Sequence, residues 1–233
     1  MAGVAGQLEE LRPESHLSRI RASRAKATHE MSGEVDRLNG GGLYRREAIE
    51  QAGCYLTHAG LHAHEELELG LRLRAAGWKL LKTNSVSMRH AAHTDPPFKL
   101  LARRWRSYYA LGPGELVRSA IGQPYLPRAL REVRFNFAMW AYWLLLLTGL
   151  LASFYQPVLI VFVLAALVLP VVAMSLRKRS ITLGAYAVAS WHVFAAGTAR
   201  GLCSRNWRDP HGRISSRLVH DGSSEAAALA DIR

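Results

Sequence analysis

The sequence predicts a small α/β domain, mostly helical with few strands, followed by a helical hairpin of membrane-spanning length. Two observations carry this prediction. Hydrophobic residues make up 49% of the 233-residue chain and gather in long apolar runs after residue 134. Before them lie one strong helix-forming segment and one short run of strand type. We therefore divide the chain into a domain at 1–118, a membrane region at 119–200 and a basic, partly disordered tail at 201–233.

Charge and cysteine content restrict the function classes. The net charge of +12 and the isoelectric point near 10.3 indicate an anionic partner, and the apolar runs favour membrane lipids over nucleic acid. No nucleic-acid recognition motif accompanies the charge, so we expect no nucleic-acid partner. Cys54 and Cys203 lack metal-ligand spacing and fit a reduced, cytoplasm-facing location. Met1 to Glu10 does not read as a signal peptide.

The first 30 residues are polar and basic. Arg19, Arg21, Arg24 and Lys26 lie close together, and the Leu, Ile and Ala content is enough for a helix. We expect a helix here with a solvated basic face.

Residues 64–78 form the segment around which the domain is organised. Glu65, Glu66 and Glu68 open it, where carboxylates suit the positive end of a helix dipole, and Gly77 closes it as a C-terminal cap. The leucines alternate as in a strand, but the residue types favour helix and the leucines also form i,i+4 pairs. The segment predicts a helix buried on two sides. A plain capped helix with a solvated acidic end is the alternative to a functional reading.

The same segment resembles the part of family 2 glycosyltransferases that usually reads Glu-Asp-x-Asp-Leu-x-x-Arg-x-x-x-x-Gly-Trp. The resemblance implies that residues 1–118 are a fragment of a GT-A catalytic domain, its acceptor half. In that family the second acidic residue is the general base that deprotonates the acceptor hydroxyl, and its match here is Glu66. Glu stands where Asp is commoner and reaches further, so Glu65 is the alternative base.

Three glycines at residues 40–42 precede Leu43-Tyr44-Arg45 and a predicted helix. Glycines allow close backbone approach to a ligand, and an anion can bind near a helix N-terminus, although most glycine runs are loops. In the family a glycine turn at this place lines the sugar-binding cleft. The resemblance therefore implies substrate-binding roles for Gly41 and Gly42.

A short strand is expected at Lys79 to Met88, followed by His90 and His93. A lone histidine is usually a surface or packed residue, and we expect this of His93. The position of His90 matches a histidine that in related folds joins the metal holding the nucleotide diphosphate. The resemblance thus implies a divalent Mg²⁺ or Mn²⁺ ion for the complete enzyme, with His90 as one ligand.

Residues 98–109 predict a basic helix bearing aromatic side chains, which ends at Gly112-Pro113-Gly114. One interpretation is an amphipathic helix on anionic lipid. The other is the family's Gln/Arg-x-x-Arg-Trp element, matched by Arg104 and Trp105. Arg104 would then bind the leaving diphosphate and Trp105 the acceptor. Leu101 replaces the expected Gln, which argues against processive polymerisation.

The runs 135–155 and 158–176 each have the length and apolar content of a membrane crossing, with a turn at Gln156-Pro157. Basic residues flank the pair at both ends, so both ends should face the cytoplasm. Residues 181–199 are a third apolar stretch, but a crossing there would put the basic tail outside. We favour an interfacial helix over a third crossing.

The chain lacks an Asp-x-Asp element, which in such enzymes holds the metal and the nucleotide. Residues 4–10 resemble the family segment just past that element, so we expect the chain to begin inside the domain. The donor half is then missing, or a partner chain supplies it.

We expect a multi-pass inner-membrane protein whose catalytic part faces the cytoplasm. Its complete form would transfer a sugar, with inversion, from a nucleotide-diphosphate donor to a glycan or lipid acceptor. This reaction would serve exopolysaccharide or glycolipid synthesis. This chain alone is expected to be inactive. The alternative is a non-catalytic membrane protein or subunit, anchored by the hairpin and by basic, lipid-facing helices.

Overall fold

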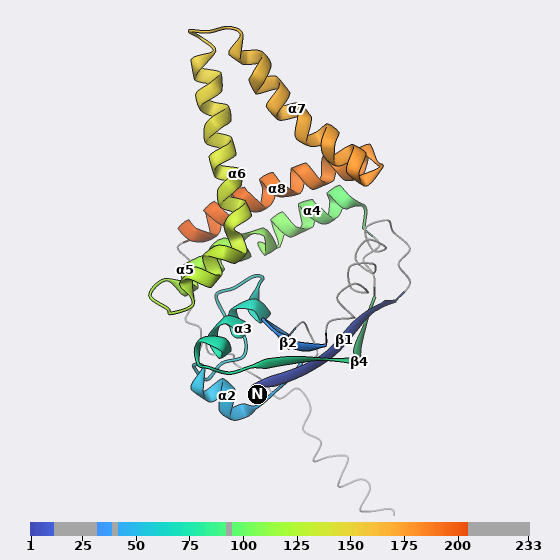
Figure 1. Ribbon diagram of the computed structural model, residues 1–233, viewed down its shortest axis with the longest axis vertical. Coiled ribbons are helices and arrows are strands. Elements are labelled where there is room, and N and C mark those ends of the chain that lie inside the picture. The colour runs from blue at the N-terminus through green and yellow to red at the C-terminus, as the bar shows by residue number, and fades with distance from the viewer. Residues whose placement is uncertain (12–31, 39–41, 92–94, 205–233) are drawn as a thin grey trace, which may run out of the picture.

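The computed structural model describes residues 1–11, 32–38, 42–91 and 95–204. It has three tiers (Figure 1): a small sheet with two helices at the bottom, a layer of helices across the middle, and a long hairpin at the top. The glycines at 40 and 41, His93 and the tail from residue 205 lie outside the described residues. The mostly helical composition and the few strands are as predicted.

The sheet has four strands in the order β2-β4-β1-β3. Strands β1 and β4 pair in parallel at its centre, and the two outer strands pair antiparallel with them. The strands are β1 (Gly3–Leu11), β2 (Gly33–Val35), β3 (Leu43–Tyr44) and β4 (Leu80–Ala91).

The helix expected near the N-terminus is wrong for Gly3–Leu11, which forms β1. The physical reason is tertiary: β1 is paired on both sides, and Ala2 and Ala5 enter the core next to Leu80 of β4. Helix propensity is a local property, and here the backbone hydrogen bonds to β3 and β4 outweigh it. The basic cluster at residues 19–26 lies outside the described residues.

Helices α2 (Arg46–Gln51) and α3 (Glu65–Ala75) flank the sheet. The prediction for α3 is confirmed, including burial on two sides. Leu69 and Leu73 pack into the core of the sheet, whereas Leu67 and Leu71 pack into a second core with the helices above. Helix α3 therefore joins the bottom tier to the middle tier.

The middle tier contains α4 (Pro97–Arg106), a 3₁₀ turn η1 (Tyr109–Leu111), α5 (Gly112–Ala120) and α8 (Ile181–Cys203). The predicted basic helix is confirmed, but it ends at Arg106, and Gly112-Pro113 begin α5 because proline suits the first helical turn. Gly114 lets α5 pack directly on the backbone of α8 at Thr198.

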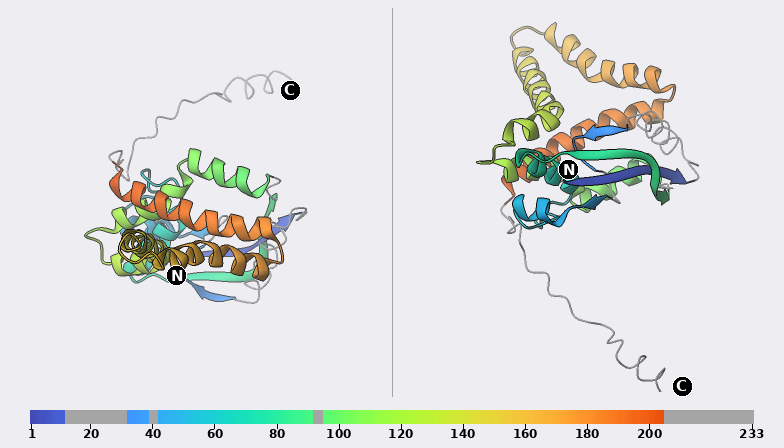
Figure 2. Two further views of the ribbon diagram at one scale, coloured as in Figure 1. Left: turned by 90° about the horizontal axis from the view of Figure 1, so that it is seen from above. Right: turned by 60° about the horizontal axis from the view of Figure 1, so that its bottom comes forward.

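The hairpin consists of α6 (Leu126–Ala152) and α7 (Leu159–Lys178), which are the two described helices long and apolar enough to cross a membrane by length and composition. The predicted turn lies between them. Helix α8 runs back from the end of α7, on which it packs, and crosses the lower part of α6 beside α4 (Figures 1 and 2). By length and composition, α8 is not among the described helices apolar enough to cross a membrane, and its prediction as an interfacial helix stays a prediction. Asn136 of α6 donates to the Thr198 hydroxyl of α8 over 2.8 Å and ties the hairpin to its base.

Candidate functional site

The predicted general base lies in the first turn of α3. Glu66 is exposed and Glu65 is partly exposed, while His64 begins the helix in the left-handed conformation with a φ angle of 70°. Burial lowers the pKa of His64, and the nearby Arg37 lowers it further. The entry to α3 thus presents carboxylates to solvent beside a histidine whose pKa is lowered.

Helix α3 packs closely on the chain that leads into the glycine turn. Gly70 faces the backbone of Asp36 and Arg37 with no room for a side chain, and Leu38 is buried against Leu69 and its neighbours. This contact fixes the helix start relative to the turn that follows residue 38.

Tyr44, just after the glycine turn, interacts electrostatically with Glu66. Burial raises the pKa of Tyr44, and the carboxylate of Glu66 raises it further. Gly42 packs on Leu38 at the near end of the turn, whereas Gly41 lies outside the described residues. The predicted base therefore lies within electrostatic range of Tyr44, which follows the described end of the predicted substrate turn.

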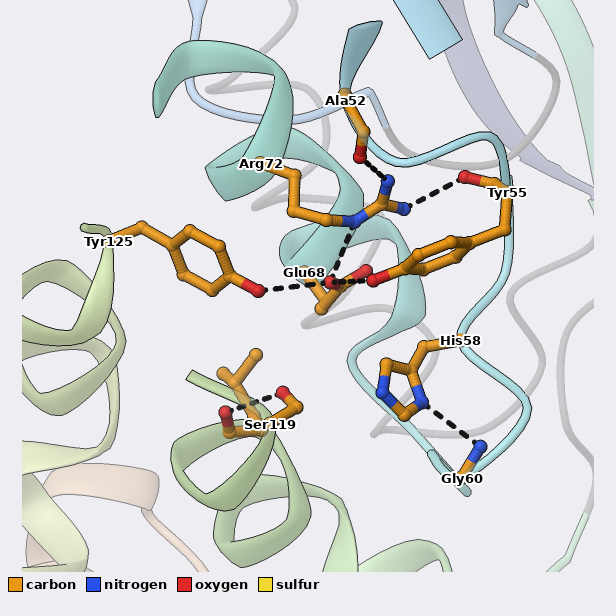
Figure 3. A network of polar contacts seen from close by, with 9 residues as sticks. Ala52, Tyr55, His58, Gly60, Glu68, Arg72, Ser119 and Tyr125 are labelled. Atoms are coloured by element: carbon orange, nitrogen blue, oxygen red, sulfur yellow. Dashed lines mark hydrogen bonds and ion pairs between the residues drawn. The ribbon is translucent and has the colours of Figure 1, made fainter. Parts of the chain in front are cut away.

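A buried polar network lies on the opposite face of α3 (Figure 3). Glu68 is fully buried, and its Oε1 accepts hydrogen bonds from Arg72 Nε (2.7 Å), Tyr55 Oη (3.2 Å) and Tyr125 Oη (3.3 Å). Its other oxygen, Oε2, has no hydrogen-bond partner among the described residues. One buried carboxylate oxygen thus gathers groups from three separate segments.

Arg72 extends this network to the loop after α2. Its guanidinium donates to the carbonyl oxygens of Ala52 and Tyr55 and lies over the Tyr55 ring, 3.6 Å from its centroid. Burial, followed by the charge of Glu68, raises the pKa of Tyr55 to about 12 and that of Tyr125 further still. Both hydroxyls therefore stay protonated and donate to Glu68 at neutral pH.

The sequence analysis missed this network. The i,i+4 spacing of Glu68 and Arg72 on one helix was a signal that could have found its centre. No local pattern pointed to Tyr55 or Tyr125, because both lie outside the helix that they contact.

A cleft of about 630 Å³ opens beside the network. Arg72, Arg118, Ser119 and Gln123 line it together with both network tyrosines. Because successive helical residues are about 100° apart, Glu66 lies on roughly the opposite side of α3 from Glu68 and does not face this cleft. The predicted base and the cleft are separate features of one helix.

His62 lies just before α3 and contacts the middle tier. Its Nδ1 lies 2.7 Å from Oε1 of the buried Glu115 on α5, and its backbone N–H donates to the other carboxylate oxygen over 2.9 Å. The imidazole also contacts the ring of Tyr108. These contacts position the loop that leads into Glu65 and Glu66.

Arg104 and Trp105 lie elsewhere. The guanidinium of Arg104 lies over the Tyr109 ring, and Trp105 lines an apolar groove between α4, α6 and α8, with the guanidinium of Arg200 over its ring. In the described part of the chain, neither residue makes a hydrogen bond, ion pair or ring contact with Glu66.

The backbone of His90 lies near the end of β4, paired with Glu10, and its side chain lies outside the described structure. Across residues 1–11, 32–38, 42–91 and 95–204, no three His, Cys, Asp or Glu side chains form a group that could hold a metal ion.

In comparisons with known proteins, no family model, no curated sequence and no solved structure matches this chain.

Proposed function

We propose that this chain is the acceptor half of an inverting glycosyltransferase of the family 2 type, working at the cytoplasmic face of a membrane. The observation that carries the proposal is the placement of Glu66: an exposed carboxylate in the first turn of α3, within the electrostatic reach of Tyr44 beside the glycine turn. A general base must be open to the hydroxyl it deprotonates, and this one is.

The internal pairing of α3 adds support. In the pattern that the segment resembles, an acidic residue and an arginine follow the base at the positions of Glu68 and Arg72. These two form the buried ion pair, at 2.7 Å, that fixes the helix and so the direction of Glu66. A plain solvated helix would not need this pair.

The proposed chemistry is direct displacement. The acceptor oxygen bonds to the anomeric carbon as the bond from that carbon to the diphosphate breaks, and the acceptor proton passes to the Glu66 carboxylate. The donor half, outside this chain, would bind the nucleotide sugar and most of the divalent metal site. His90, Arg104 and the glycine turn are proposed contributors to binding, and α6 and α7 are the proposed membrane anchor.

The test is sugar transfer in native membranes. Membranes from cells lacking the gene, restored with either wild-type chain or Glu66→Gln, would be given labelled nucleotide sugars, and label in lipid and polysaccharide would be measured. Glu66→Gln should lower incorporation by about 10²–10⁴-fold, the usual contribution of a general base. Glu47→Gln, an exposed first-turn glutamate on α2, is the matched control and should behave as wild type. Equal incorporation with Glu66→Gln would refute the proposed base.

A non-catalytic membrane subunit is the second candidate. The observation that favours it is Trp105, which lines a groove against the hairpin whose described wall does not include Glu66. Incorporation that needs the chain but is insensitive to Glu66→Gln would support this role.

A further inference from the structure

An apolar groove lies where the hairpin meets the middle tier. Its volume is about 550 Å³, and α4, α6 and α8 each supply part of its wall, including Phe98, Leu101, Trp105, Trp143 and Ala196. Phe98 is 46% exposed, so a large aromatic ring stands open at this surface. Such an open apolar groove indicates a binding site for an apolar ligand.

Two polar groups of the groove wall are paired with each other. The indole Nε1 of Trp143 donates to Nδ1 of His192 over 2.8 Å, and the two rings stack nearly parallel, with an interplanar angle of 8°. Because these two polar groups bond to each other, the wall presents mainly apolar surface and few hydrogen-bonding groups to a ligand. A hydrocarbon chain fits this surface better than a sugar or a peptide backbone.

The groove is continuous with the membrane-facing part of the molecule. Trp143 belongs to α6, one of the two described helices apolar enough to cross a bilayer, and contacts α8 through its hydrogen bond to His192. If the hairpin is embedded, the groove opens near the boundary between acyl chains and headgroups, where tryptophan is favoured. Lipid chains are the apolar molecules present at that depth.

Basic side chains lie next to the groove. By helical spacing, Lys99, Arg103 and Arg106 share one side of α4, adjacent to the side that lines the groove. Asp95 pairs with Lys99 and Arg103, which leaves this stripe with a net positive charge. Arg200 adds a further cation over the Trp105 ring. Arginine and lysine in this position suit the phosphate of a lipid headgroup.

We propose that this groove binds the hydrocarbon chain of an anionic membrane lipid, whose phosphate lies on the basic stripe of α4. The inference rests on the membrane insertion included in the proposed function and does not depend on glycosyl transfer. It assigns Trp105 a place against a lipid chain.

Photocrosslinking of the full chain tests the inference. The protein would be reconstituted in phosphatidylcholine vesicles containing phosphatidylglycerol with a diazirine in its acyl chain, and labelled residues would be mapped by mass spectrometry. We expect label at residues 98–105 and 193–196 in addition to α7. Ala196→Phe fills the groove and should reduce groove labelling several-fold, whereas labelling of α7 stays unchanged. Ala102→Trp, on the opposite wall, is the second groove-filling variant.

The headgroup is tested separately. The double variant Arg103→Gln, Arg106→Gln should remove the preference for labelled phosphatidylglycerol over labelled phosphatidylcholine. Arg46→Gln, at a 92% exposed position on α2, is the control and should keep the preference. Label on α7 without label in the groove would overturn the groove while leaving membrane insertion standing. Absence of label on the hairpin would overturn both, and equal labelling by the two lipids would overturn the basic stripe.

Discussion

Replacing Glu68 by Gln should destabilise the protein far more than its small change in size suggests. The side chain is fully buried, and the charge of Arg72, which is 6% exposed, is balanced by this carboxylate at 2.7 Å. Glutamine keeps the shape but removes the negative charge, so the guanidinium is left buried and uncompensated. Breaking a buried ion pair on one side costs about 3–5 kcal/mol.

The two tyrosine hydroxyls contribute to the same loss. Their bonds to an ionised oxygen become bonds to a neutral amide, which are weaker by about 1 kcal/mol each. This loss is part of the 3–5 kcal/mol and is not added to it, because all three donors share Oε1 of Glu68. For a chain of this size the total corresponds to a fall of about 6–20 °C in the unfolding midpoint.

The assay is thermal unfolding of the detergent-solubilised full chain, followed by near-ultraviolet circular dichroism. Glu50→Gln is the matched control, since Glu50 and Arg46 form an i,i+4 pair at the same 2.7 Å but on the surface. An exposed pair contributes about 0–1 kcal/mol, so the control should shift little. The double variant Glu68→Leu, Arg72→Leu should cost clearly less than the sum of its single variants. A shift for Glu68→Gln no larger than that of the control, or an additive double variant, would refute the reasoning.

Three further predictions concern stability in the same assay. Because the pKa of Tyr125 is raised in the folded protein, its contribution to the free energy of unfolding is full below pH 10 and is lost as the pH rises through its folded-state pKa. Tyr125→Phe should therefore flatten the decline in stability above pH 10, and an unchanged decline would contradict this. The pKa of His64 is lowered in the folded protein, so its contribution to the free energy of unfolding is full above pH 6.5 and is lost on acidification. His64→Gln should therefore reduce the loss of stability below pH 6.5, and an unchanged stability profile in acid would disprove this. Gly114→Ala should cost about 1–3 kcal/mol or more, because the added methyl meets the Thr198 backbone of α8, whereas Ser107→Ala at an exposed position should be nearly neutral.

The sequence predicted those parts of the fold whose cause is local. Helix α3, the basic helix α4 and the hairpin each carry their own pattern of helix formers, charges or apolar length, and each lies close to its predicted place. Strand β1 was missed because its partners lie far along the chain: Gly3 pairs with Leu80, and Leu11 with Ala91. The residues around β1 in the sequence do not indicate a partner so far along the chain.

The candidate site divides in the same way. The position of Glu66 in the first helical turn could be predicted, because the residues that set it are its neighbours in the chain. The network around Glu68 could be predicted only at Arg72, four residues on. Tyr55 and Tyr125 reach it from segments 13 and 57 residues away in sequence. The groove at Trp105 depends on three helices, and none of them alone shows a concave surface.

The parallel pairing of β1 with β4 also affects the order of events during synthesis. At a synthesis rate of about 5–20 residues per second, roughly 4–16 s pass between synthesis of β1 and synthesis of its partner β4, which begins at Leu80. Both central strands precede α6 in the chain. The nascent sheet can therefore close before the apolar hairpin is complete, and β1 lacks its parallel partner during the interval.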